Sequence, residues 1–75
     1  MKKLLMVVEP KNNYFESKEQ FEQNAVLFNE HMLKKFSSNV MPLLNSVTTE
    51  WVRVSDDYLT DNIKKMNFNF YFREL

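Results

Sequence analysis

The most regular hydrophobic pattern in the chain is an alternation near its C-terminal end, in the stretch NFNFYF at positions 67–72. Successive side chains point to opposite sides of an extended strand. One side then carries three aromatic rings, those of Phe68, Phe70 and Phe72. The other side carries Asn69 and Tyr71. The pattern predicts a strand from Asn67 to Glu74 with one apolar and one largely polar face.

Three further segments have strand character. Leu4 to Val8 is a continuous apolar run, as expected for a central strand that is buried on both faces. Val47 to Val54 is rich in β-branched residues around Trp51. Val40 to Leu44 contains Pro42, which cannot donate a backbone hydrogen bond to a neighbouring strand. The sequence therefore predicts an edge strand or an irregular link at 40–44.

A long amphipathic helix is predicted to begin at Ser17. This serine is followed three places later by Gln20, which is a capping-box pattern. A stripe of apolar residues follows at helical spacings and consists of Phe21, Ala25, Phe28, Met32 and Phe36. Lys34 and Lys35 suit the last turn, and the stretch 37–39 breaks the pattern. We therefore expect one helix from Ser17 to Phe36.

A second, shorter helix is predicted after Ser55, which is a favourable N-cap residue. Asp56 and Asp57 fall in its first turn, where the helix dipole favours negative charge. Its apolar face consists of Leu59, Ile63 and Met66. Lys64 and Lys65 lie at its end, where the dipole favours positive charge.

The predicted element order is strand, helix, strand, strand, helix, strand. We expect a single α+β domain over residues 1–75, with a ferredoxin-like antiparallel sheet whose first and third strands are central. Both helices are expected on one face of this sheet. If the segment 40–44 is irregular, the alternative is a three-stranded sheet with two helices on one face.

This arrangement predicts an open sheet face with an unusual composition. Its residues are Trp51, Arg53, Asn69, Tyr71 and Arg73. The first strand adds one of its two apolar sets, which begin at Leu4 and Leu5. Such a face is unfavourable to leave in water. Three interpretations follow: a protein partner or a second copy binds it, single-stranded nucleic acid stacks on its rings, or a loop or tail of the chain covers it.

Composition excludes several classes of function. Basic and acidic residues balance at ten each, so a general electrostatic nucleic-acid binder is disfavoured. Glycine is absent, which excludes Gly-rich phosphate loops. Cysteine is also absent, so neither disulfides nor thiolate metal sites exist. The apolar run after the first lysines is too short for a signal peptide or a membrane span, and we expect a cytoplasmic protein without a membrane partner.

Candidate catalytic residues are few and isolated. The aspartates near Ser55 are explained by the helix dipole rather than by a metal site, including the pair Asp57 and Asp61. His31 has no second histidine and no evident nucleophile to assist. Glu9 would need a symmetric dimer to build a metal-dependent nuclease. We therefore predict no enzyme activity, no cofactor, no metal and no small-molecule substrate. The methionines, Met6, Met32 and Met66 among them, are interpreted as core filler.

The sequence favours a small non-enzymatic protein-interaction module. Its asparagine and lysine content is typical of an AT-rich genome, and a phage-type inhibitor or regulator of a host protein would suit its size. The expected mechanism is steric occupation of a partner, or homodimerisation, through the open face or an edge strand. Trp51 and Tyr71 would anchor the complex, and Arg53 and Arg73 would orient it. The alternative is a single-stranded RNA- or DNA-binding protein that uses the same face.

Overall fold

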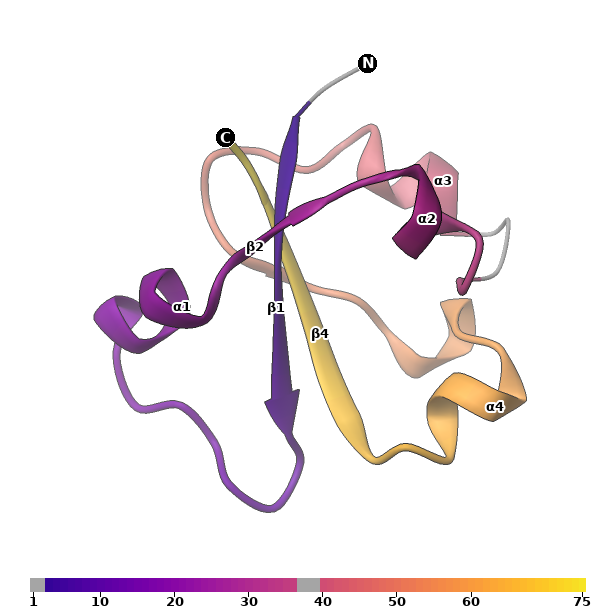
Figure 1. Ribbon diagram of the computed structural model, residues 1–75, viewed down its shortest axis with the longest axis horizontal. Coiled ribbons are helices and arrows are strands. Elements are labelled where there is room, and N and C mark those ends of the chain that lie inside the picture. Colours follow the sequence, from indigo (N-terminus) through magenta and orange to yellow (C-terminus); the bar gives the residue numbers. More distant parts are fainter. Residues whose placement is uncertain (1–2, 37–39) are drawn as a thin grey trace.

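The computed structural model describes residues 3–36 and 40–75. The strands are β1 (Leu4–Pro10), β2 (Val26–Phe28), β3 (Val52–Arg53) and β4 (Phe68–Glu74). The helices are α1 (Lys18–Asn24), α2 (Glu30–Leu33), α3 (Val40–Leu44) and α4 (Asp61–Lys64), and a 3₁₀ turn η1 spans Asp56–Tyr58. The fold is α+β with a four-stranded antiparallel sheet, as predicted (Figure 1).

The sheet has the order β2-β1-β4-β3. β1 and β4 form its centre and pair from Leu4 opposite Glu74 to Pro10 opposite Phe68. The central position of the first strand is confirmed, but the ferredoxin-like arrangement is not, because its central neighbour is the last strand rather than the third. The physical reason is length: β4 offers seven residues with an apolar face, whereas β3 offers two.

The single helix predicted from Ser17 to Phe36 is wrong. The capping box of Ser17 and Gln20 is present, but α1 ends at Asn24 and the chain continues as β2. β2 pairs with Leu4–Met6 and so covers half of the free edge of β1. Asn29 then accepts a hydrogen bond from a backbone N–H and caps α2. The run Ala-Val-Leu-Phe between Asn24 and Asn29 suits a strand better than a helix interior, since its last three residues favour extended backbone.

The edge strand predicted at 40–44 is also wrong, since this segment forms α3. Pro42 is the third residue of this helix. The N–H groups of the first turn have no partner within a helix, so the missing N–H of proline costs little there. The stretch 37–39, where the sequence predicts the end of a helix, lies outside the described residues.

The second predicted helix is divided into η1 and α4. Ser55 accepts a hydrogen bond from the Asp57 N–H and caps η1, as its position in the sequence predicted. Leu59 is extended and buried, so the chain leaves the helical path to place this side chain in the core. The strand predicted at 47–54 is reduced to β3, although Thr48 still accepts a hydrogen bond from the β4 residue Glu74.

The hydrophobic core lies on one face of the sheet, which we name the apolar face. Its buried residues are Leu4, Met6, Val40, Leu44, Val47, Val54, Leu59, Phe70 and Phe72. The Phe72 ring packs edge-to-face against Phe28, with centroids 4.9 Å apart, and Phe36 packs similarly against Phe70 at 5.2 Å. The apolar side predicted for the strand at 67–74 is buried at Phe70 and Phe72 and half-buried at Phe68.

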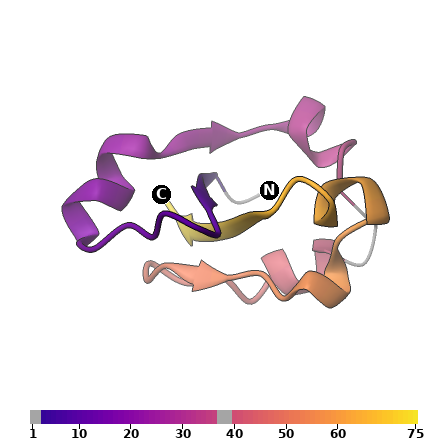
Figure 2. The same cartoon turned by 90° about the horizontal axis from the view of Figure 1, so that it is seen from below.

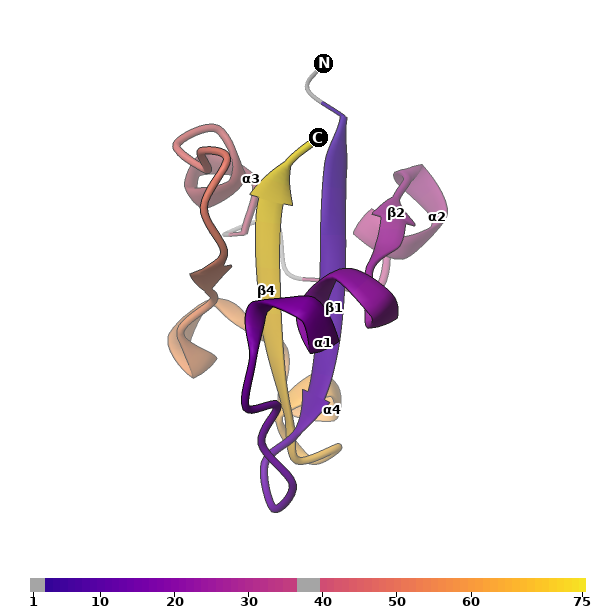
Figure 3. The same ribbon diagram turned by 90° about the vertical axis from the view of Figure 1, so that its left-hand side faces the viewer.

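The helices lie on both faces of the sheet rather than on one. Figure 2 shows α1 on one side of the central strands, with α2, α3 and α4 on the other. Figure 3 shows α1 directly in front of β1 and β4. The expectation that both helices cover the same face is wrong, because the break after Asn24 separates α1 from α2 and lets β2 pass along the sheet edge between them.

Candidate functional site

The structure places the five residues of the predicted partner site on one side of the sheet, opposite the apolar face. They are Trp51, Arg53, Asn69, Tyr71 and Arg73, and we name this side the polar face. Arg53 lies opposite Tyr71 in the β3–β4 ladder and donates hydrogen bonds to Asn69 Oδ1 from Nε (3.3 Å) and Nη2 (3.1 Å). The Arg73 guanidinium carbon lies 5.4 Å from the centroid of the Trp51 ring. Their role in binding a partner stays a prediction.

The polar face has a cover of its own, which is α1. The Phe21 ring stacks on Trp51 with centroids 5.7 Å apart and meets Tyr71 edge-to-face at 4.8 Å. Glu22 forms a 2.9 Å ion pair with Arg73. On this face Asn69 is buried, Trp51, Tyr71 and Arg73 are half-buried, and Arg53 stays exposed. α1 thus occupies the rings and charges that the sequence suggested for a partner.

A buried carboxylate lies under this cover. Glu9 is only 1% exposed, at the far end of β1. Its Oε1 accepts hydrogen bonds from Asn69 Nδ2 (3.0 Å) and the Tyr71 hydroxyl (2.9 Å), and its Oε2 accepts one from the Phe15 N–H (2.7 Å). A buried carboxylate is tolerated only when it is hydrogen-bonded in this way. Glu9 therefore fastens the loop that leads into α1 to the central strands.

These contacts shift the acidity of both partners. Burial alone raises the pKa of Glu9, but the hydrogen bonds from Asn69, Phe15 and Tyr71 and the nearby charge of Arg53 lower it more, so the net pKa lies below its usual value. Burial, together with the hydrogen bond to Glu9, raises the pKa of Tyr71 to about 12. Glu9 is thus ionised and Tyr71 neutral at neutral pH, which suits a structural clasp rather than proton transfer.

Two donors under α1 are buried without a hydrogen bond of standard geometry, Trp51 Nε1 and Arg73 Nε. The indole N–H is still close enough to Glu22 to contribute to the lowered pKa of that carboxyl, for which the hydrogen bond from Arg73 is the main cause. A buried donor without a good acceptor costs about 1 to 3 kcal/mol. The buried polar groups of this face are therefore less completely hydrogen-bonded at Trp51 than at Glu9.

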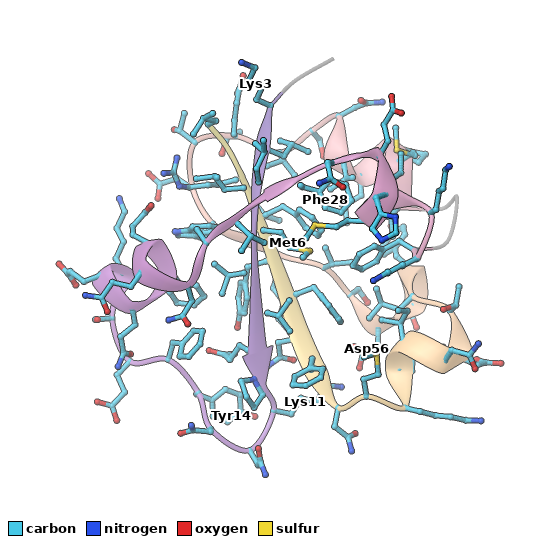
Figure 4. All side chains as sticks on the ribbon, viewed as in Figure 1. Lys3, Met6, Lys11, Tyr14, Phe28 and Asp56 are labelled. Carbon is cyan, nitrogen blue, oxygen red and sulfur yellow. The ribbon has the colours of Figure 1, made fainter. Side chains whose placement is uncertain are left out.

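The described ranges contain no cluster of three or more histidine or acidic residues that could hold a metal ion. Both oxygens of Glu9 are engaged within the chain. Asp56 forms a 2.8 Å ion pair with Lys11, which is the main cause of its lowered pKa. Figure 4 labels both of these residues, near the turn where β1 ends. His31 is exposed on α2. This set offers neither a nucleophile–base pair nor a metal site.

A second candidate site lies on the apolar face, where the helices leave the core incompletely covered. It is an open hollow, which we name the methionine groove. It is lined by Met6, Val8, Met32, Lys35, Phe36, Ile63, Met66, Phe68 and Phe70. Met66 is 54% exposed, and Val8 and Phe68 are half-buried. Figure 4 shows Met6 on the side of β1 toward α2, so sheet and helix residues meet in this groove.

Sequence reasoning missed the methionine groove. Met6, Met32 and Met66 are far apart along the chain, and each was interpreted as core filler. The only local signal was the position of Met66 just after α4. The helix has ended there, so another segment of the chain would be needed to bury its side chain. Among the described residues, Lys35 is the one charged residue that lines the groove, and no acidic residue does.

Comparison of the chain with models of protein families, with curated proteins and with solved structures finds no match. The function must therefore be argued from the geometry of the chain itself. In the part of the chain that the structure describes, every helix is too short to cross a membrane.

Proposed function

We propose that this protein is a non-enzymatic interaction domain that binds another protein through the methionine groove. The observation that carries the proposal is a continuous apolar hollow on the side of the sheet that also holds the core. Met66, Ile63 and Phe68 stand at its border with partial or full access to solvent. Apolar surface of this kind is stabilised when a partner removes it from water, by about 25 cal/mol for each Å².

The side chains of the groove suit a docking surface. Methionine is unbranched and flexible, and its polarisable sulfur makes favourable contacts with aromatic rings. Met32 and Met66 can therefore adjust to a partner side chain placed over the half-buried Phe68. A floor of aromatic rings with a flexible methionine border accepts apolar anchors of different shapes.

The polar face supports the proposal less well than the groove does. A partner or a single-stranded nucleic acid there would need the rings of Trp51 and Tyr71, which already contact Phe21. It would also need Arg73, which already pairs with Glu22. Binding at the polar face, by protein or by nucleic acid, requires α1 to move away first, and it stays a prediction.

The groove proposal is tested with a pair of matched substitutions. Met66 and Leu27 are exposed to a similar extent, 54% and 52%, but Leu27 lies on the edge strand β2, outside the groove. We expect affinity capture from the native cell to retain one specific protein with the wild type and with Leu27→Glu, and to lose it with Met66→Glu. Calorimetry of the purified partner with the wild type and with each variant then measures the loss of affinity.

Circular dichroism and thermal unfolding of both variants check that neither substitution disrupts the fold. Retention of the same partner by Met66→Glu at unchanged affinity would contradict the proposal. Loss of the partner with Leu27→Glu alone would place the contact at the β2 edge instead, where a second copy of the chain is a further candidate.

A further inference from the structure

The edge of β1 beside the methionine groove is only half covered. β4 pairs with β1 along its whole length, from Leu4 to Pro10. β2, on the opposite edge, pairs only with Leu4–Met6, because the chain turns into β2 at Val26. Among the described residues, the second half of β1 therefore has no strand neighbour on this side. Figure 1 shows the lower half of β1 with no strand in front of it.

The backbone of Val8 points toward this free edge. The Lys11 N–H donates to the Asn67 carbonyl at one end of the β1–β4 ladder, and the Leu75 N–H donates to the Lys3 carbonyl at the other. Odd-numbered residues of β1 therefore direct their N–H and C=O groups toward β4, since these groups alternate along a strand. The N–H and C=O of Val8 are left facing away from β4, beyond the start of β2. A free pair of this kind is a template for another strand.

The free edge and the groove are adjacent because Val8 belongs to both. Its backbone faces the edge, and its side chain lines the methionine groove. A segment that pairs with Val8 would direct alternate side chains toward the same face as Met6 and Phe70. One large apolar side chain of that segment would enter the groove between α2 and α4. The backbone would supply affinity, and the groove would select the side chain.

The charge of the groove defines a second feature of the ligand. Lys35 lines the groove and has no ion-pair partner among the described residues. It also follows the end of α2, where the helix dipole favours a positive charge. An acidic side chain of the ligand, two residues from its apolar anchor and therefore on the same face of the added strand, would form an ion pair with the exposed Lys35.

We infer that the methionine groove binds an extended peptide segment of the partner, which adds as a short strand beside Val8, inserts a large apolar side chain and presents a carboxylate to Lys35. This inference rests on the proposed function and specifies the ligand. Pro10 has no N–H to offer, so the added strand gains little beyond Val8 and stays short. The occupant is thus a linear motif, not a second copy of the folded chain.

The test uses the full chain and a displayed library of random peptides of about eight residues, a typical strand length. Selected peptides are synthesised and measured by fluorescence anisotropy. We expect an alternating pattern with one large apolar residue and an aspartate or glutamate two residues away. Methylation of the backbone nitrogen that faces Val8 should weaken binding about tenfold or more, since it removes a hydrogen bond and adds a clash. Methylation of the adjacent nitrogen, which faces solvent, should have little effect.

A charge exchange tests the role of Lys35. Lys35→Glu should weaken the acidic peptides about tenfold and restore binding to versions in which the acidic residue is replaced by lysine. Lys34→Glu is the matched control, because Lys34 does not line the groove. Peptides that require Met66 but tolerate every backbone methylation, or bind as helices, would overturn strand addition while leaving the proposed function intact. Selection of no peptide that depends on Met66 would overturn this inference, whereas the capture experiment decides the proposed function separately.

Discussion

The two faces of the central β1–β4 pair are covered in physically different ways. On the polar face, one short helix without a buried residue is held by the ion pair of Glu22 and the ring contacts of Phe21, and the loop before it is held by the Phe15 N–H bond to the buried Glu9. On the apolar face, three short helices surround a core of apolar side chains centred on Phe72, which is held by hydrophobic packing and edge-to-face ring contacts.

This difference explains why the groove lies where it does. The ion pair between Glu22 and Arg73 positions α1 over the sheet, because a partly buried charge without a partner is costly. Apolar packing carries no such requirement at the border of the core, so the space between α2 and α4 can stay open. In this protein the polar face, which has the more unusual composition, is covered by α1. The apolar face keeps the apolar surface that a partner can reach.

The largest expected effect is on the apolar face. Phe72→Ala removes a fully buried ring and should cost about 3 to 5 kcal/mol of unfolding free energy. Domains of this size have only about 4 to 11 kcal/mol in total, so the variant should be largely unfolded in mild denaturant. Urea unfolding followed by circular dichroism measures the loss. Phe68→Ala, on the same strand and face but half-buried, is the matched control and should lose clearly less.

An intermediate effect is expected at the buried carboxylate of the polar face. Glu9→Gln replaces an acceptor of hydrogen bonds with an amide that cannot satisfy Asn69, Tyr71 and Phe15 together, and should cost about 1.5 to 3 kcal/mol at neutral pH. The folded-state pKa of Glu9 is below its unfolded value. Its contribution is therefore fully present above the unfolded pKa and is lost as the pH falls through the lowered folded pKa.

The measurement is the difference in unfolding free energy between wild type and Glu9→Gln as a function of pH. This difference should be largest near neutrality and should close in acid. Glu22 and Asp56 also have lowered pKa values and titrate in the same window, so the slope of the wild type alone is not diagnostic. Glu50→Gln, at an exposed position, is the control. A difference that stays constant with pH would contradict an ionised Glu9.

The smallest effect is expected at the contact between α1 and the sheet. Phe21→Ala removes the ring contacts to Trp51 and Tyr71 and should cost about 1 kcal/mol. α1 should then detach more often, which exposes the only tryptophan of the chain. We expect a red shift of the Trp51 fluorescence and faster tryptic cleavage after Lys18. Tyr14→Ala, at a residue 66% exposed, should change neither. An unchanged fluorescence in Phe21→Ala would mean that α1 is held mainly by its polar contacts.

Local patterns in the sequence predicted the parts of the fold that depend on neighbouring residues. The alternation around Phe70 assigned each β4 side chain to its face, and Ser17 and Ser55 were identified as caps. The prediction failed where a helical spacing also fitted another structure. The apolar stripe through Phe28 suits a helix, yet the free edge of β1 offered this segment strand partners, and no local pattern contains that information.

Both candidate sites depend on residues that only the folded chain brings together. The clasp joins Glu9 to Asn69, and the groove joins Met6 to Met66. The sequence could place Asn69 and Tyr71 on one face, because they lie on one strand. It could not show that α1 would reach the same face, since that depends on the break after Asn24 and on the loop that the Glu9 carboxylate holds.

The pairing of β1 with β4 has a consequence for how the protein acquires its structure. Glu9 and Asn69 are 60 positions apart, so the two middle strands of the sheet come from opposite ends of the sequence. Closing so long a loop costs conformational entropy before strand pairing can stabilise the structure, and this slows folding. During synthesis, β1 cannot pair with β4 until β4 has left the ribosome, so apolar side chains of β1 stay exposed until then. In this interval the nascent polypeptide is most prone to aggregate or to need a chaperone.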